Sequence, residues 1–221
     1  MGLSFASGSV DALGYLLLGR VFVSNMTGNI VLLGLAVGRV QVQATIRSLT
    51  ALGGFCVGVA VGALIGGRGG DGQPWSPSIM VALAIEAAAL LVLATTWPLV
   101  ATFSLLLLIA LAAVAMGMQS ATVRQVGVAD VATTYVTGTL TGAVTHAVGV
   151  LTRGRSPAAR APTGPPTSPW LRVSVLSAYL AGAVAGGAGA TAWQSRAAFI
   201  PAVVVSLVAG AGAWTRRVRG S

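Results

Sequence analysis

The chain has 221 residues, of which 55% are hydrophobic and 8% are charged, and its mean hydropathy is +0.87. Soluble domains carry about 25% charged residues, so this composition excludes a soluble domain with a polar surface. The formal net charge of +9 arises from 13 arginines against four acids, and the arginines gather in the connections between apolar runs. This arrangement indicates membrane topology and not nucleic-acid binding.

Eight apolar segments follow one another along the chain, and several have the roughly 20 residues that a membrane-spanning helix needs. We therefore expect an all-α polytopic membrane protein, surrounded by the lipid bilayer, in which residues 1–221 form a single membrane domain. In chain order the segments are residues 3–19, 24–38, 44–67, 78–97, 101–122, 133–150, 170–193 and 197–214.

The segments fall into two sets of four, which predicts an internal duplication with repeats over residues 1–97 and 98–221. The phrase NMTGN around Thr27 recurs as YVTGT around Thr137. In the third segment of each set, small residues recur every four positions. Residues four apart share one helix face, so we expect these faces to pack closely against other helices. The small residues are Gly54, Gly58, Gly62 and Gly66 in the first repeat, and Ala178, Gly182, Gly186 and Ala190 in the second.

The connections predict an orientation but leave the topology open. Residues 153–169 are rich in proline, arginine and small residues, and we expect a disordered cytoplasmic loop there. If all eight segments cross the membrane, nine arginines lie on the side of the two termini and four on the other, which predicts cytoplasmic termini. The count is the same if the second and sixth segments enter and return. The first arrangement gives two parallel halves of four helices, and the second gives two inverted halves of three.

The repeated phrase predicts two interrupted helices. Residues 20–25, RVFVSN, are β-branched and aromatic, which favours extended backbone, and Asn25 or Thr27 is expected to cap the helix that follows. In the second copy Thr134 or Thr137 takes this place. A helix that starts at membrane depth has N–H groups without partners and needs protein or a wet cavity beside it.

We expect the two helix starts to meet near the middle of the membrane and to form a small polar site that favours an anion. The alternative is that these hydroxyls bond to their own helices and that the glycines serve close packing. The expected lining of the site is Asn25, Thr27, Gly28, Asn29, Thr134, Thr137, Gly138 and Thr139.

Ionisable residues inside apolar segments are costly and commonly functional. Asp11 and Glu86 lie centrally in the first and fourth segments, and His146 lies toward the end of the sixth. Asp11 is expected either to couple a proton or cation or to tie two helices by a hydrogen bond. Gln119 and Glu86 are expected to support the site, and His146 either supports it or is structural.

The sequence contains no enzyme signature: no Ser–His–acid set, no phosphate-binding Gly-rich loop and no His/Cys pair at metal spacing. We therefore expect a protein that is not an enzyme and that uses no cofactor and no metal. The leading interpretation is a transporter or channel for a small solute. The alternative is a non-transporting scaffold or accessory subunit whose glycine-spaced helices bind a partner or a second copy of the chain.

Two stretches carry a resemblance to a known family. GSVDALGYLLLGRVFVSNMTGNIVLLGLAVG, followed by MGMQSATVRQVGVADVATTYVTGTLTG, resembles the YoaK-type bacterial membrane proteins, a family of unknown function. One departure is Ser120, where similar proteins often have asparagine. The resemblance implies a bacterial inner-membrane protein of about six or more helices, and it supplies no substrate or mechanism.

Overall fold

The computed structural model describes residues 1–66, 76–97, 105–125, 140, 144 and 169–220. Within these ranges the chain is all-helical and contains no strand, as the sequence predicts. The expected segment 133–150 lies outside the described residues, apart from Leu140 and Val144. Of the expected loop 153–169, residues 153–168 also lie outside them, and Pro169 is the first residue of α7. The helices are α1 (Gly2–Leu17), α2 (Met26–Gly38), α3 (Val42–Gly66), α4 (Pro77–Thr96), α5 (Leu105–Gln125), α7 (Pro169–Trp193), the 3-10 helix η3 (Gln194–Ala198) and α8 (Phe199–Gly220).

Four stretches of the described chain are long and apolar enough to cross a membrane. They are Val42–Ile65, Pro77–Thr96, Leu105–Arg124 and Trp170–Val218. The last of these contains α7, η3 and α8, and α7 and α8 have 25 and 22 residues, which suits one crossing each.

The outward faces of these helices carry exposed aliphatic side chains, as a lipid-facing surface requires. On α3 they include Val57 and Leu64, and on α7 they include Leu180 and Val184. The buried interior is built mainly from small and aliphatic residues such as Leu90. Both features fit a helical bundle that is solvated by lipid.

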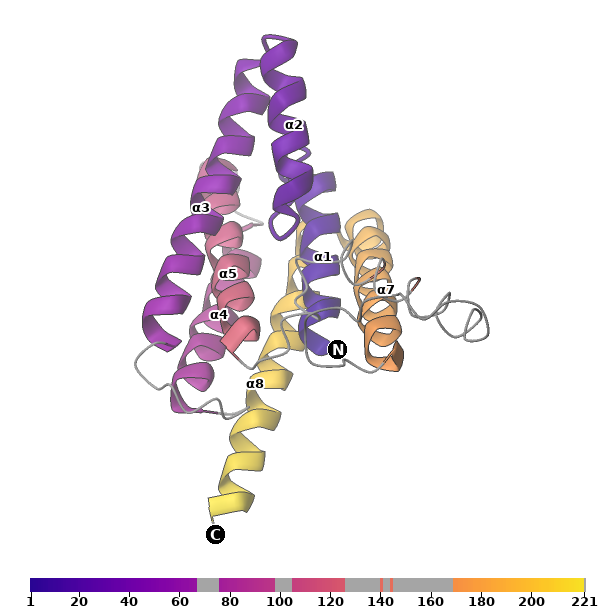
Figure 1. Cartoon of the computed structure of the whole chain (residues 1–221). Helices are drawn as coiled ribbons and strands as arrows, with labels where there is room; N and C mark the ends of the chain where they lie inside the picture. The colour runs from indigo at the N-terminus through magenta and orange to yellow at the C-terminus, as the bar shows by residue number, and fades with distance from the viewer. Residues whose placement is uncertain (67–75, 98–104, 126–139, 141–143, 145–168, 221) are drawn as a thin grey trace, which may run out of the picture.

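The helices run in two opposite directions (Figure 1). α1, α4 and α7 run one way, and α3, α5 and α8 run the other way. The packing agrees with the picture for two pairs of helices. Gly182 and Gly186 of α7 lie against Phe5 and Ser9 of α1 in the same order along both helices, and Gly58 and Gly62 of α3 lie against Val114 and Met118 of α5 in the same way. The most extensive contacts join α3 to α5 and α1 to α7, so each half of the chain packs mainly on the other half.

Glycines let α1 and α7 touch through their backbones. A Cβ atom at Gly182 would collide with the carbonyl oxygen of Phe5, and one at Gly186 would lie 2.6 Å from the carbonyl oxygen of Ser9. Seen from the other helix, Gly8 of α1 lies against the backbone of Tyr179. Only glycine permits so close an approach.

The same kind of contact joins α3 and α5. A Cβ atom at Gly58 would collide with the carbonyl oxygen of Val114, and one at Gly62 would lie 3.1 Å from the carbonyl oxygen of Met118. Gly54, one turn before Gly58, also lies against α5, and Gly66 is the last residue of α3. The glycine face of α3 is therefore occupied by a helix of the same chain.

Candidate functional site

The chain leaves helical geometry between α1 and α2. Gly19 has a φ of 85°, which favours glycine, and Arg20 has a φ of 63°. The following backbone is non-helical up to Asn25, and α2 starts at Met26, as the sequence predicts. This segment, residues 18–25, is called the break below. Val21 and Val23 within it are 1% and 0% exposed, so the irregular backbone is buried in protein.

The carboxylate of Asp11 in α1 holds the break. One carboxylate oxygen accepts hydrogen bonds from the backbone N–H groups of Val23 at 2.8 Å and Ser24 at 2.7 Å, with Asn25 at 3.4 Å. The other oxygen accepts the Ser24 hydroxyl at 2.6 Å and the Tyr179 hydroxyl of α7 at 2.8 Å. All five contacts come from hydrogen-bond donors, so both oxygens of Asp11 act as acceptors. Asp11 and its donors are called the clamp.

Asn25 and Asn29 close the break from the side of α2. The side chain of Asn25 caps α2 by accepting from the N–H group of Gly28 at 3.2 Å, which confirms that Asn25 is the N-cap. The amide of Asn29 accepts from the N–H group of Phe22 at 2.9 Å and donates to the carbonyl oxygen of the same residue. Both asparagines thus bind the chain's own backbone, and Asn29 is fully buried.

Gln119 of α5 connects to α1. Its side-chain oxygen accepts from the hydroxyl of Ser7 at 3.2 Å, and its side-chain nitrogen donates to the carbonyl oxygen of Leu3 at 2.9 Å. Gln119 is 1% exposed. These two hydrogen bonds satisfy its buried amide, which neither lipid nor apolar side chains could do. Gln119 therefore fixes α1 against α5 within a turn of the clamp.

Glu86 lies in the middle of α4 and is 1% exposed. Neither of its carboxyl oxygens has a hydrogen-bond partner in the part of the chain that the structure describes. The buried residues one turn away on the same face are Ala82, Leu83 and Leu90, all apolar. An acid in such surroundings does not stabilise the packing.

Replacement of Glu86 by methionine, which has a similar volume, is expected to raise the free energy of unfolding by about 1–2 kcal/mol, because a buried polar group without partners is removed. Thermal unfolding in detergent measures this. Ile85→Met, at the neighbouring and 42% exposed position, is the matched control and should change little. A loss of stability in Glu86→Met alone would mean that the acid has a partner outside the described residues.

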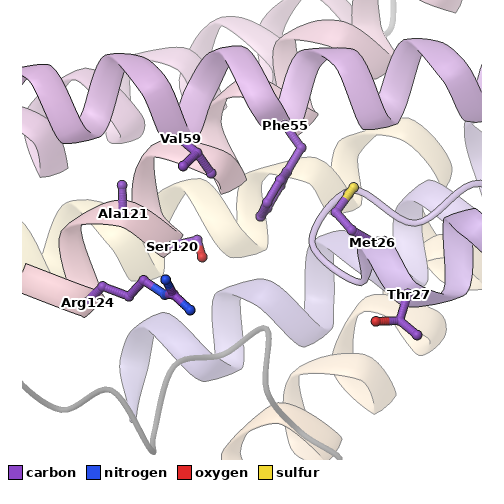
Figure 2. A pocket seen from close by; sticks show the side chains of 7 residues that line it. All are labelled: Met26, Thr27, Phe55, Val59, Ser120, Ala121 and Arg124. Atoms are coloured by element: carbon purple, nitrogen blue, oxygen red, sulfur yellow. The ribbon is translucent and has the colours of Figure 1, made fainter.

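A pocket of about 300 Å³ lies between the start of α2, α3 and α5 (Figure 2). The guanidinium of Arg124 and the hydroxyl of Thr27 lie on opposite sides of it. Apolar side chains and one further hydroxyl complete the described lining, which is Met26, Thr27, Phe55, Val59, Ser120, Ala121 and Arg124. The pocket therefore combines a cation and hydroxyls with an apolar wall, next to the electropositive start of a helix.

The structure brings some of the sequence-predicted residues together and separates others. Thr27 lines the pocket, whereas Asn25 and Asn29 are not among its described lining residues. Asp11 and Gln119 lie at the clamp and at the α1–α5 contact, and Glu86 lies apart from them in α4. The residues of the second phrase, Thr134, Thr137, Gly138 and Thr139, and also His146, lie outside the described residues.

The sequence does not predict the part that Tyr179, Arg124 and Phe55 take in the site. A tyrosine inside an apolar helix needs a partner for its hydroxyl, so Tyr179 is the one of the three that a search for unsatisfied polar groups finds. The place of Arg124 and Phe55 beside Thr27 depends on how α3 and α5 pack.

Helices long enough to cross a bilayer, lipid-facing aliphatic surfaces and a polar break buried between helices define a multi-pass helical membrane protein. The model of the family described as protein of unknown function (DUF1275) matches residues 1–211, so the chain belongs to this family. It is 43% identical over 139 residues to the UPF0700 transmembrane protein YoaK of Bacillus subtilis (strain 168), which covers 62% of this chain and 61% of the relative. The chain thus aligns with less than two thirds of that relative's length. No solved structure matches the chain.

Proposed function

We propose that the chain is a transporter or channel for a small polar solute, built from two inverted repeats, and that the pocket beside the start of α2 is its binding site. The observation that carries the proposal is the position of this pocket at an interrupted helix. In inverted-repeat transporters, substrates bind where interrupted helices expose their ends.

Matched backbone contacts support the duplication. Gly182 lies against Phe5, and Gly58 lies against Val114. The two glycines are 124 positions apart, and their two partners are 109 positions apart. A duplication predicts a constant offset for each pair of equivalent helices, because equivalent residues then make equivalent contacts.

Two further pairs of contacts have the same offsets. Gly186 against Ser9 corresponds to Gly62 against Met118, again with 124 positions between the glycines and 109 between the partners. The converse contact corresponds as well, since Gly8 lies against Tyr179 as Gly117 lies against Phe55. Three pairs of contacts along the two helix crossings thus have the same offsets. This agreement supports the equivalence of α1 with α5 and of α3 with α7.

The helix directions favour inverted over parallel repeats. α1 and α5 run in opposite directions, as do α3 and α7, and α4 and α8 (Figure 1). A pseudo-twofold axis in the plane of the membrane relates such halves. We further propose cytoplasmic N- and C-termini in a bacterial inner membrane, because nine arginines then lie on the cytoplasmic side and four on the other.

The packing weakens the argument for a scaffold. That alternative assigned the glycine faces of α3 and α7 to a partner or a second copy. In the structure Gly58 and Gly182 contact α5 and α1 of the same chain. These faces are therefore not available for another protein while the bundle is intact.

Replacement of Thr27 by valine is expected to weaken solute binding about tenfold, because valine keeps the shape of threonine and removes one hydroxyl from the pocket. The measurement is a thermal-unfolding screen of the purified protein in detergent against small anions, amino acids and neutral metabolites, followed by uptake into proteoliposomes. A solute that binds the folded protein raises its melting temperature.

The matched control is Thr50→Val on α3, whose hydroxyl is exposed and donates to its own helix at Ile46. It should bind as the wild type does. Uptake that is equally fast in wild type and Thr27→Val would exclude this pocket as the solute site. A well-folded protein that responds to no solute would favour the scaffold.

A further inference from the structure

The pocket and the clamp occupy corresponding places in the two proposed repeats. With the offset of 109, Asp11 of α1 corresponds to Ser120 of α5. With the offset of 124, Phe55 of α3 corresponds to Tyr179 of α7. Ser120 and Phe55 both line the pocket. The pocket between α3 and α5 therefore lies at the place that corresponds to the contact between α1 and α7, where the Asp11 carboxylate and the Tyr179 phenol that donates to it meet.

The two places differ in their polar groups. In the first repeat the chain supplies a carboxylate, and five donors surround its two oxygens. In the second repeat the equivalent side chain is a hydroxyl, and no acid is among the described lining residues. Among the described residues, the pocket of about 300 Å³ therefore lies at the position that corresponds to the Asp11 carboxylate.

The charge of the pocket also differs from that of the clamp. Arg124 corresponds to Tyr15 with the same offset of 109, so the second repeat has a guanidinium where the first has a neutral ring. A guanidinium recognises carboxylates well, since its N–H groups match the two oxygens of the anion. Figure 2 shows it directed into the same space as the hydroxyl of Thr27.

We propose that the solute carries a carboxylate, which binds near Ser120 and Arg124 and takes the place that the Asp11 side chain occupies in the other repeat. The proposal rests on the transporter function proposed above and names its substrate class. The guanidinium and the Ser120 and Thr27 hydroxyls donate to the carboxylate. The apolar wall, which includes Phe55, receives the remainder of a small organic acid.

Matched pairs of ligands test the substrate class. The full-length protein in detergent is heated with acetate and acetamide, lactate and lactamide, and succinate and succinamide, and with phosphate and sulfate as inorganic anions. The carboxylates are expected to raise the melting temperature, and their amides, which have nearly the same shape without the charge, are not. Equal shifts from acids and amides, or shifts from inorganic anions only, would overturn the inference and leave the transporter proposal standing.

Two substitutions of the same residue test the location. Ser120→Asp supplies the missing carboxylate from the chain and is expected to reduce carboxylate binding by at least tenfold, because the new charge fills the site. Ser120→Asn has the same size and no charge, and it should retain binding within a few-fold. Uptake of the best carboxylate into proteoliposomes should follow the same order.

The outcomes separate the two proposals. Loss of binding in Ser120→Asp with retention in Ser120→Asn supports the inference, provided that both variants unfold within a few degrees of the wild type. Equal loss in both variants would show that bulk and not charge decides, and retention in Ser120→Asp would exclude this place for the carboxylate. If no compound of any class binds or enters proteoliposomes, the transporter function itself fails.

Discussion

Replacement of Asp11 by alanine is expected to lower the free energy of unfolding by roughly 3–5 kcal/mol, because each buried donor that is left without an acceptor costs about 1–3 kcal/mol. The N–H groups of Val23 and Ser24 would lose their acceptor inside the bundle, and so would the hydroxyl of Tyr179. Buried donors without acceptors are costly in a membrane, where no water replaces the lost partner. The break is then expected to unfold before the rest of the bundle.

Thermal unfolding in detergent and hydrogen exchange across residues 18–25 measure this effect. Ser7→Ala, one turn earlier on α1, is the matched control because it removes the single hydrogen bond to Gln119. It should cost about 1 kcal/mol. Equal stabilities for the two variants would mean that the clamp does not hold the break.

Replacement of Gly58 and Gly182 together by alanine is expected to lower the free energy of unfolding by roughly 2–6 kcal/mol, from about 1–3 kcal/mol for each overpacked contact. Each new Cβ atom would collide with a backbone carbonyl oxygen of the partner helix, Val114 in one case and Phe5 in the other. A backbone atom cannot rotate away as a side chain can, so the helices must separate.

Gly53 and Gly187 provide a matched control on the same two helices, because a Cβ atom at either position meets no other atom within 4 Å. The double variant Gly53→Ala with Gly187→Ala should be as stable as the wild type or more stable, since alanine favours helix more than glycine does. If both double variants lose stability alike, helix propensity and not the crossing would be responsible.

The local part of the site could be predicted from the sequence. Asn25 as a helix cap and the non-helical run before it follow from β-branched residues, an asparagine and a glycine close together in the chain. The glycine faces of α3 and α7 follow from a spacing of four. In each case the residues that carry the prediction lie within one or two helical turns of the feature that they predict.

The long-range part could not be predicted. That Tyr179 donates to Asp11 depends on which face of α7 meets α1, and the sequence gives no register between helices so far apart. The polarity of Asn29 suggested a solute contact, whereas its amide is occupied by the backbone of Phe22. A polar side chain near a break satisfies either the chain or a ligand, and only the fold distinguishes the two.

The pairing of α1 with α7 also has a consequence for synthesis of the protein. Tyr179 follows Asp11 by 168 residues, which at translation rates of about 5–20 residues per second corresponds to roughly ten to thirty seconds. During this time α1, with its buried serines and Asp11, has left the ribosome without the helix that covers it. Until α7 is made, the polar groups of α1 therefore need other contacts. Either the insertion machinery covers them, or residues 18–25 fold early onto the Asp11 carboxylate.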